Sequence, residues 1–227
     1  MSLVDQATQY IARKHEGQYR GGLNVPYSTH LFGVARILKA ANYEDDIVVA
    51  GLLHDVLEDT DATEEDVREL FGENILMLVK AVSEQDKSLN WERRKQYMIN
   101  QIKYLSEDAL AIVLAEKIQN VRAIKYELSQ LGESTWDYFN AGKDMQYWYY
   151  ANIIEQIKKY AGVTDLDFNI FDAEKFQVSI DEIYGNTIQE KVWYTLRSAG
   201  YSEYSTAGVM ANLLAESSFK TNNLENS

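Results

Sequence analysis

Hydrophobic residues recur with helical spacing through the first 162 residues of the chain. One run places four apolar side chains at positions i, i+3, i+4 and i+7: Leu31, Val34, Ala35 and Leu38. The run Ile47–Leu57 is apolar on nearly all sides and is interrupted within it only by His54 and Asp55. Because a helix that is apolar all round lies in a protein's interior, this pattern predicts one continuous, buried, central helix.

Capping residues mark further helices downstream. Thr63 is expected at an N-cap, because acidic residues fill the turn that follows it. Ser106 or Asp108 opens the apolar run Ala109–Ile124, and Trp136–Tyr160 is expected to form a last, aromatic-rich helix. No strand-like alternation outweighs these signals, so the first 160 residues are predicted to be an all-α helical bundle.

The composition changes after Gly162. The stretch 163–190 holds seven acidic residues against one lysine, which indicates a solvated, acidic linker. An amphipathic helical pattern returns at Lys191–Leu214. We therefore expect three parts: a helical domain over 1–162, an acidic linker over 163–187 and a short helical segment over 188–227.

Composition and charge exclude several classes of protein. The chain has no cysteine, which rules out disulfides, a thiolate nucleophile and cysteine-ligated metal sites. Its net charge of −13 argues against a nucleic-acid partner, since phosphate backbones bind basic surfaces. Its longest apolar stretch is far shorter than the ~20 residues of a membrane span, and its N-terminus lacks the pattern of a signal peptide. A cytoplasmic protein is expected.

The adjacent pair His54-Asp55 in an apolar run requires a compensating partner. Burying an imidazole and a carboxylate without one is costly, and a divalent metal is an economical solution. His30 on the preceding helix supplies a second imidazole, and Glu116 in a later apolar run supplies a second carboxylate. Such a mixed set of nitrogen and oxygen ligands suits Mn, Fe or Zn. The alternative is a buried His–Asp hydrogen bond that joins two helices, and spacing alone leaves both open.

Two further carboxylates follow the pair. Glu58 and Asp59 lie one helical turn beyond Asp55, so all three can face one cavity. Carboxylates beside a metal can act as a general acid or base that orients the attacking water. The alternative is a solvated helix end.

Candidate substrate-binding groups lie on both sides of this region. Lys14 and Arg20 precede the turn at Gly21-Gly22, and the planar guanidinium of Arg20 can stack on a base or clamp a phosphate. Asn120 follows Glu116 at i+4, so one helical face could serve metal and substrate together.

These residues together resemble a known family. The His30, His54-Asp55 and later-acid pattern resembles that of HD-domain phosphohydrolases, and the finer match is to RelA/SpoT-type alarmone hydrolases, particularly the small stand-alone members. Three segments are similar to that group's HxGQxR, PYxxH and HDxxEDT motifs: His15–Arg20, Pro26–His30 and His54–Thr60. Further similar segments are Trp91–Lys95, Leu114–Arg122 and Phe139–Tyr150. The resemblance covers about residues 5–162.

The resemblance implies an all-α fold with one Mn²⁺ held by four residues: His30, His54, Asp55 and Glu116. It implies that Glu58 and Asp59 position the attacking water. The reaction would be removal of the 3′-pyrophosphate from guanosine 3′,5′-bis(diphosphate), so the partner is a small-molecule nucleotide. Arg20 and Asn120 match positions that the family uses on the guanine base.

The chain departs from the family pattern at two positions. Glu116 stands where the family usually has Asp, and the extra methylene shifts the carboxylate on a scale that metal sites feel. Gly21 stands where the family tends to have Lys, which removes one cation near the substrate. We therefore expect a metal-dependent phosphohydrolase of low activity. Two alternatives remain: a phosphohydrolase of another nucleotide, or a non-enzymatic nucleotide-binding module.

A second, fainter resemblance concerns residues 188–227, which look like the opening of a phage tail lysozyme domain. Glu216 matches the catalytic acid of that family. Glycoside hydrolysis needs a formed cleft and usually a second carboxylate, and this segment is short. A non-catalytic helical fragment is expected.

Overall fold

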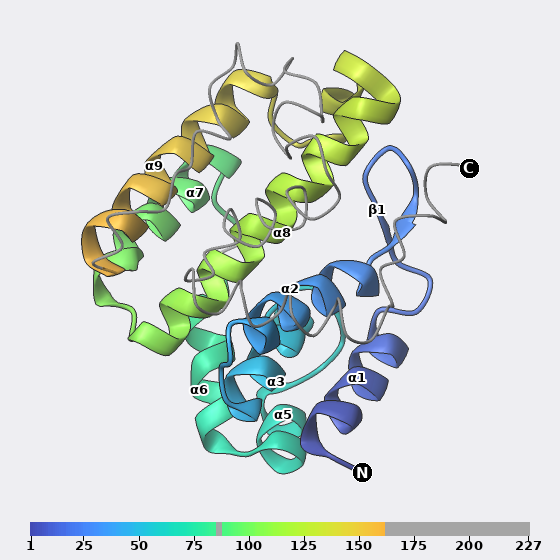
Figure 1. The fold of residues 1–227 in the computed structure, drawn as a ribbon, viewed down its shortest axis with the longest axis vertical. Helices are drawn as coiled ribbons and strands as arrows, with labels where there is room; N and C mark the ends of the chain where they lie inside the picture. The colour runs from blue at the N-terminus through green and yellow to red at the C-terminus, as the bar shows by residue number, and fades with distance from the viewer. Residues whose placement is uncertain (85–87, 162–227) are drawn as a thin grey trace, which may run out of the picture. The chain divides into compact units, whose positions relative to one another are not determined.

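The computed structural model describes residues 1–84 and 88–161, which all belong to one compact unit, Met1–Asp165 (Figure 1). The acidic linker expected over 163–187, the helical segment expected over 188–227 and Glu216 lie outside the described residues. Within the described part, the prediction of an all-α fold is confirmed, with one addition: a two-stranded antiparallel hairpin.

The N-terminal half begins with α1 (Leu3–Lys14), the hairpin strands β1 (Tyr19–Arg20) and β2 (Val25–Pro26), and α2 (Ser28–Ala40). It continues through α3, α4, α5 and α6, which span Asp45–Leu53, Val56–Asp59, Glu64–Phe71 and Glu73–Val82. The C-terminal half comprises α7, the 3₁₀ turn η1, α8, the 3₁₀ segment η2 and α9, which span Trp91–Gln101, Ile102–Tyr104, Glu107–Leu131, Gly132–Tyr138 and Lys143–Ala161.

Helix α3 forms the centre of the N-terminal half, and every one of its residues from Ile47 to Leu53 is buried. It packs against α1, α2, α6 and α8. The long helix α8 then separates this group from α7 and α9, which pack on each other beyond it (Figure 1). Burial of apolar side chains on all sides of α3 is the main stabilising contribution of this half.

The expected continuous helix over Ile47–Leu57 is wrong. Helix α3 ends at Leu53, and α4 begins at Val56. At the break, His54 and Asp55 keep right-handed backbone angles, and the carbonyl of His54 lies 3.3 Å from the Ser83 hydroxyl, which also donates to the Val79 carbonyl at 2.8 Å. Apolar periodicity cannot detect such a break, because both sides of it are buried.

The expected helix over Trp136–Tyr160 is also too long. Trp136 lies in η2, and α9 begins only at Lys143, directly after Gly142. The predicted N-caps are confirmed at Thr63, which forms a capping box with Asp66, and at Ser106, whose hydroxyl accepts from the Ala109 amide at 3.2 Å. Asp108 therefore sits inside the first turn of α8.

None of the helices that the structure describes is both long and apolar enough to cross a membrane.

Candidate active site

Three predicted metal ligands meet where α2 approaches the break between α3 and α4. His30 lies in the first turn of α2, while His54 and Asp55 form the break itself. One ligand atom of each residue lies within 4.8 Å of the others, and both imidazoles are buried. Residues 24 positions apart in the sequence thus share one small site.

Hydrogen bonds orient both imidazoles toward each other. The Nδ1 atom of His54 lies 2.8 Å from the carbonyl of Gly51, and Nδ1 of His30 contacts Oε1 of Gln119 on α8. Since a carbonyl oxygen only accepts, each Nδ1 donates, and each ring turns its Nε2 toward the site. The two Nε2 atoms are 3.2 Å apart. Two Nε2 atoms that face each other beside a carboxylate can share a proton or hold a cation, so this donor set fits a divalent metal.

The carboxylate of Asp55 adds the charge that such a cation needs. Its Oδ2 lies 3.1 Å from Nε2 of His54 and 3.8 Å from Nε2 of His30. Burial lowers the pKa of His54, but Asp55 outweighs burial and raises it to about 9. At His30 burial prevails and lowers the pKa to about 3. Burial raises the pKa of Asp55, but the two histidines hold it well below its ordinary value. The site therefore favours positive charge, either a proton or a metal ion.

The carboxylate of the fourth predicted ligand, Glu116, is already bound by a neighbouring lysine. It lies on α8 outside the three-residue group described above. Both of its carboxylate oxygens accept from Lys117 Nζ at 2.7 Å, and one accepts from Asn120 Nδ2 at 2.9 Å. Burial raises the pKa of Glu116, but Lys117 and His54 outweigh it and lower the pKa below its ordinary value. The buried ammonium of Lys117 is a partner that helical spacing did not reveal.

Tyr27, which sequence reasoning missed, connects two of the predicted carboxylates. Its hydroxyl donates to Oδ2 of Asp55 at 2.7 Å and lies 3.1 Å from Oδ2 of Asp59. Burial, Asp55 and Asp59 raise its pKa far above the ordinary value, so the phenol stays protonated. Its ring stacks on the buried imidazole of His15, with ring centroids 5.0 Å apart. The similarity of Pro26–His30 to PYxxH was the available signal.

Glu58 occupies a more apolar environment than Asp59. Its Oε1 accepts from the amide of Glu84 at 2.8 Å. Burial, together with the charge of Asp55, raises the pKa of Glu58 to about 7. A carboxyl group that titrates near neutral pH is suited to proton transfer. Asp59, by contrast, is exposed. Its backbone carbonyl accepts a hydrogen bond from Gln18 Nε2 at 2.7 Å.

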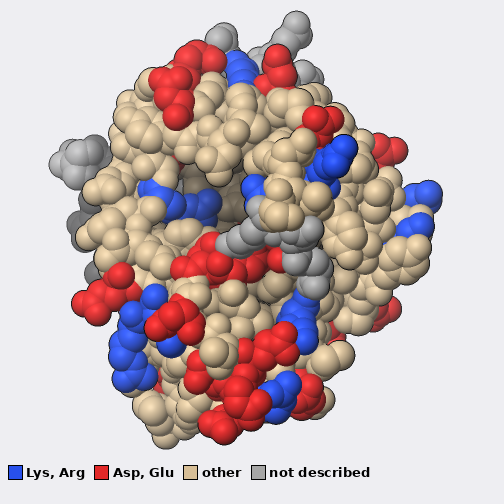
Figure 2. Space-filling model, turned by 180° about the vertical axis from the view of Figure 1, so that it is seen from behind, with Lys and Arg blue, Asp and Glu red and all other residues tan. Residues whose placement is uncertain are grey.

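Two cations that sequence reasoning did not single out are linked to Glu58 through Glu84. Arg94 and Lys95 on α7 both bind the carboxylate of Glu84, whose amide contacts Glu58. On the face seen in Figure 2, acidic side chains gather along one edge of a hollow and basic side chains line its walls. Basic side chains thus lie beside acidic ones at this hollow, although the net charge of the chain is −13.

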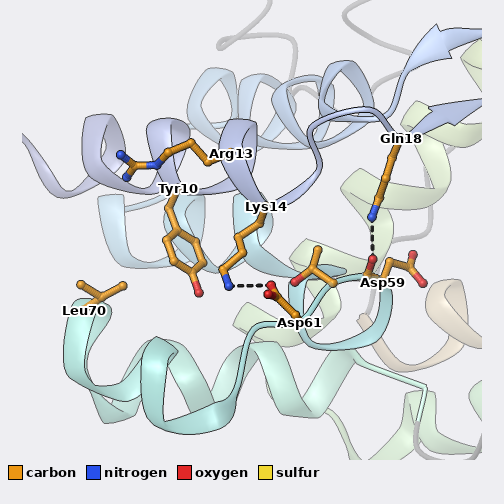
Figure 3. Close-up of a pocket in the computed structure, with 8 residues that line it drawn as sticks. Tyr10, Arg13, Lys14, Gln18, Asp59, Asp61 and Leu70 are labelled. Carbon is orange, nitrogen blue, oxygen red and sulfur yellow. Dashed lines mark hydrogen bonds and ion pairs between the residues drawn. The ribbon is translucent and has the colours of Figure 1, made fainter.

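The predicted substrate-binding residues divide between two places. Arg20 in β1 donates to Oδ1 of Asn120 at 2.8 Å, which connects the hairpin to α8 and, through Asn120, to Glu116. Lys14 instead forms an ion pair with Asp61 at 2.6 Å. It lines a cavity of about 830 Å³ together with seven other residues: Tyr10, Arg13, Gln18, Asp59, Thr60, Asp61 and Leu70 (Figure 3). This cavity adjoins the predicted metal ligands through Asp59, which shares the Tyr27 hydroxyl with Asp55.

Comparison with known families decides the relationship of this chain. A family model described as HD domain matches residues 7–140. The chain belongs to the HD-domain family. The adjacent pair His54-Asp55, at the break between α3 and α4, lies within the matched residues.

Two curated relatives of this HD domain carry the same activity in their names. The chain is 40% identical over 123 residues to guanosine-3′,5′-bis(diphosphate) 3′-pyrophosphohydrolase MESH1 of Drosophila melanogaster, covering 53% of this chain and 68% of that protein. It is 41% identical over 120 residues to the Homo sapiens protein of the same name, covering 52% and 66%. The chain thus spans about two thirds of the length of these relatives.

Solved structures give the same relationship in three dimensions. A structure described as a metazoan ortholog of SpoT that hydrolyzes ppGpp superposes with a TM-score of 0.62 at 30% identity, covering 70% of this chain and 88% of that one. The structure of lmo0812 from Listeria monocytogenes EGD-e gives 0.54 at 41% identity, covering 57% and 83%. The likeness therefore lies in the described HD domain.

Proposed function

We propose that this HD domain hydrolyses guanosine 3′,5′-bis(diphosphate), removes its 3′-pyrophosphate and requires one divalent metal, with Mn²⁺ as the candidate. The observation that carries the proposal is the pair of Nε2 atoms of His30 and His54, 3.2 Å apart beside the Asp55 carboxylate. The substrate is a small nucleotide in the cytoplasm, and neither a nucleic acid nor a membrane is a partner.

His30, His54 and Asp55 would hold the metal, with Glu116 as a fourth ligand when its carboxylate leaves Lys117. A bound divalent ion supplies Lewis acidity and lowers the pKa of a water molecule. Gln119 and the Gly51 carbonyl keep both imidazoles in the tautomer that binds a cation.

Glu58 and Asp59 would orient the attacking water and exchange its proton. The pKa of Glu58, raised to about 7, lets this carboxyl take and return a proton near neutral pH. The Tyr27 hydroxyl, shared between Asp55 and Asp59, fixes the position of Asp59 relative to the metal ligands.

Arg20 and Asn120 would bind the guanine base, and Lys14 would contribute positive charge near the substrate. The hydrogen bond from Arg20 to Asn120 places a planar cation and a side-chain amide at one point between β1 and α8. Planar stacking and paired hydrogen bonds are the means by which proteins recognise bases.

The direct test is an assay of purified protein with guanosine 3′,5′-bis(diphosphate), with and without Mn²⁺, following the release of GDP and pyrophosphate. We expect turnover that depends on the metal and higher turnover from Glu116→Asp, whose shorter side chain suits the site. An inactive His54→Asn variant that keeps the wild-type melting temperature would be the matched control. Absence of product from both wild type and Glu116→Asp, together with absence of metal by elemental analysis, would refute the proposal.

A nucleotide-binding module without turnover is the second candidate, and the Lys117–Glu116 ion pair favours it. If Lys117 keeps Glu116 from the metal, the pocket binds its nucleotide without hydrolysing it. Nucleotide would then raise the melting temperature equally with and without Mn²⁺, and no product would form. A panel of other nucleotides in the same assay tests whether the substrate is a different phosphate ester.

A further inference from the structure

The side chain of Gln18 connects two parts of the chain that meet beside the proposed site (Figure 3). Its Nε2 donates to the backbone carbonyl of Asp59 at 2.7 Å, and its Oε1 lies 2.8 Å from Nδ1 of His15. Since a carbonyl oxygen only accepts, the amide nitrogen of Gln18 faces Asp59 and the amide oxygen faces His15. Nδ1 of His15 therefore donates to Gln18, and the hydrogen bonds run in one direction from the imidazole to Asp59.

His15 is a fixed anchor for this chain of hydrogen bonds. It is 3% exposed, and its backbone amide donates to the carbonyl of Ile11 at the end of α1 at 3.0 Å. Its ring stacks on Tyr27 with an angle of 6° between the ring planes. The Tyr27 hydroxyl lies 3.1 Å from the Asp59 carboxylate. Asp59 is thus connected to one anchor twice, at its backbone through Gln18 and at its carboxylate through Tyr27.

The base of the hairpin keeps these two connections together. The amide of Tyr27 donates to the carbonyl of Gln18 at 2.9 Å, next to the pair Tyr19–Pro26 of the two strands. Arg20, for which we propose contact with the guanine base, lies in β1, directly after this point. The hairpin that would bind the base therefore also holds the residue that would orient the attacking water.

Asp59 depends on such support because of its place in the fold. It is the last residue of α4, which is only four residues long, and it is exposed. The ends of helices fray, so the backbone of α4 does not by itself fix the carboxylate. A catalytic group has to be held within about 0.5 Å of its productive geometry. The hydrogen bond from Gln18 supplies this constraint at the point where the helix ends.

We propose that Gln18 is a positioning residue for hydrolysis, whose side-chain amide holds the backbone of Asp59 and thereby directs the Asp59 carboxylate to the attacking water. This inference rests on the proposed function, in which Asp59 orients that water. Gln18 acts through Asp59 and contacts neither the nucleotide nor the metal in this role. Its loss therefore changes the chemical step and leaves binding of the nucleotide unchanged.

Gln18→Met tests this role, because it removes both side-chain hydrogen bonds at similar size. With guanosine 3′,5′-bis(diphosphate) and Mn²⁺, we expect kcat to fall about 10- to 100-fold, since a misplacement of about 1 Å can cost about 100-fold in rate. KM should remain as in wild type, because Arg20 and Asn120 are untouched. Gln18→Glu keeps an acceptor for His15 but offers no donor to Asp59, so it should lose kcat to the same extent. Gln9→Met, at an exposed glutamine of α1, is the matched control and should behave as wild type.

Hydrogen exchange separates this inference from the proposed function, because it needs no turnover. Exchange of the backbone amides of Asp59 and Thr60 should be faster in Gln18→Met than in wild type or Gln9→Met. Absence of turnover in wild type, together with this faster exchange, would refute the proposed function alone. Equal exchange in all three proteins would overturn the role of Gln18. So would a wild-type kcat in Gln18→Met or Gln18→Glu, or a rise in KM without a fall in kcat.

Discussion

At the scale of single residues, the proposed metal ligands are held in place by hydrogen bonds from neighbouring groups. Gln119 and the Gly51 carbonyl set the imidazole tautomers, and the hydroxyl of Tyr27 lies between two carboxylates. Such outer partners commonly change metal affinity or activity by about 10- to 100-fold when they are removed. The sequence identified the ligand types, but not these partners, because each reaches the site from a different part of the chain.

Tyr27→Phe removes the shared hydroxyl while keeping the ring that stacks on His15. We expect kcat and Mn²⁺ affinity to fall by about 10- to 100-fold, since Asp55 and Asp59 lose their common donor. The melting temperature should change little. Steady-state kinetics and metal titration measure these effects, and Tyr126→Phe, which alters a phenol that is 60% exposed, serves as the control. Wild-type kinetics in Tyr27→Phe would show that the hydroxyl has no positioning role.

At the scale of secondary structure, the approach of α2 to α3 sets the distance between His30 and His54. The two helices meet at Gly51, where a β-carbon would lie 2.4 Å from Cδ1 of Leu38, itself 1% exposed. Sequence periodicity predicted both helices, yet it placed His54 and Asp55 inside a continuous helix. In the structure, α3 ends at Leu53 and α4 begins at Val56, with both residues between them.

Gly51→Ala should push α3 away from α2. Overpacking a core costs about 1–3 kcal/mol, and the better helix propensity of Ala offsets about 1 kcal/mol of this. We therefore expect the free energy of unfolding to fall by up to about 2 kcal/mol. Metal affinity should fall about 10-fold or more, because ligand sets tolerate shifts of only ~0.2 Å.

Gly142→Ala is the matched control for this change. A β-carbon on Gly142 would meet no atom within 4 Å, so stability and metal affinity should remain as in wild type. Urea unfolding and metal titration of both variants measure the difference. Equal metal affinity in Gly51→Ala and Gly142→Ala would show that the helix approach does not control the site.

At the scale of the whole described domain, Glu84 joins the N-terminal helices to α7. Its carboxylate binds Arg94 and Lys95, and its amide donates to Glu58. Burial raises the pKa of Glu84, but Lys95 and Arg94 outweigh it and lower the pKa below its ordinary value. The two halves of the domain are thus connected next to the proposed catalytic acid.

This lowered pKa predicts a pH-dependent contribution to stability. A carboxyl whose pKa is lower in the folded state stabilises the fold above its unfolded pKa of about 4.3, and the contribution is lost as the pH falls through the folded pKa. Glu84→Gln should therefore lower the free energy of unfolding by about 1–3 kcal/mol at pH 7. The difference from wild type should shrink as the pH falls below about 4.

Urea unfolding at several pH values between 3 and 7 measures this dependence. Glu133→Gln, which removes an exposed ion pair with Lys143, is the control and should show little effect at any pH. A stability loss in Glu84→Gln that is the same at pH 3 and pH 7 would mean that charge pairing is not its cause.

The sequence by itself determined the all-α fold, the capping residues Thr63 and Ser106, and the kinds of donor atom predicted for the site. These are local properties: helical spacing, an N-cap hydroxyl or an imidazole can be identified within a few residues. Only the tertiary structure decided that His30 faces His54, that Lys117 pairs with Glu116, that Tyr27 links Asp55 to Asp59 and that Gln18 binds the backbone of Asp59. These contacts depend on how helices cross and where a helix breaks, because packing brings together side chains whose separation along the chain carries no signal.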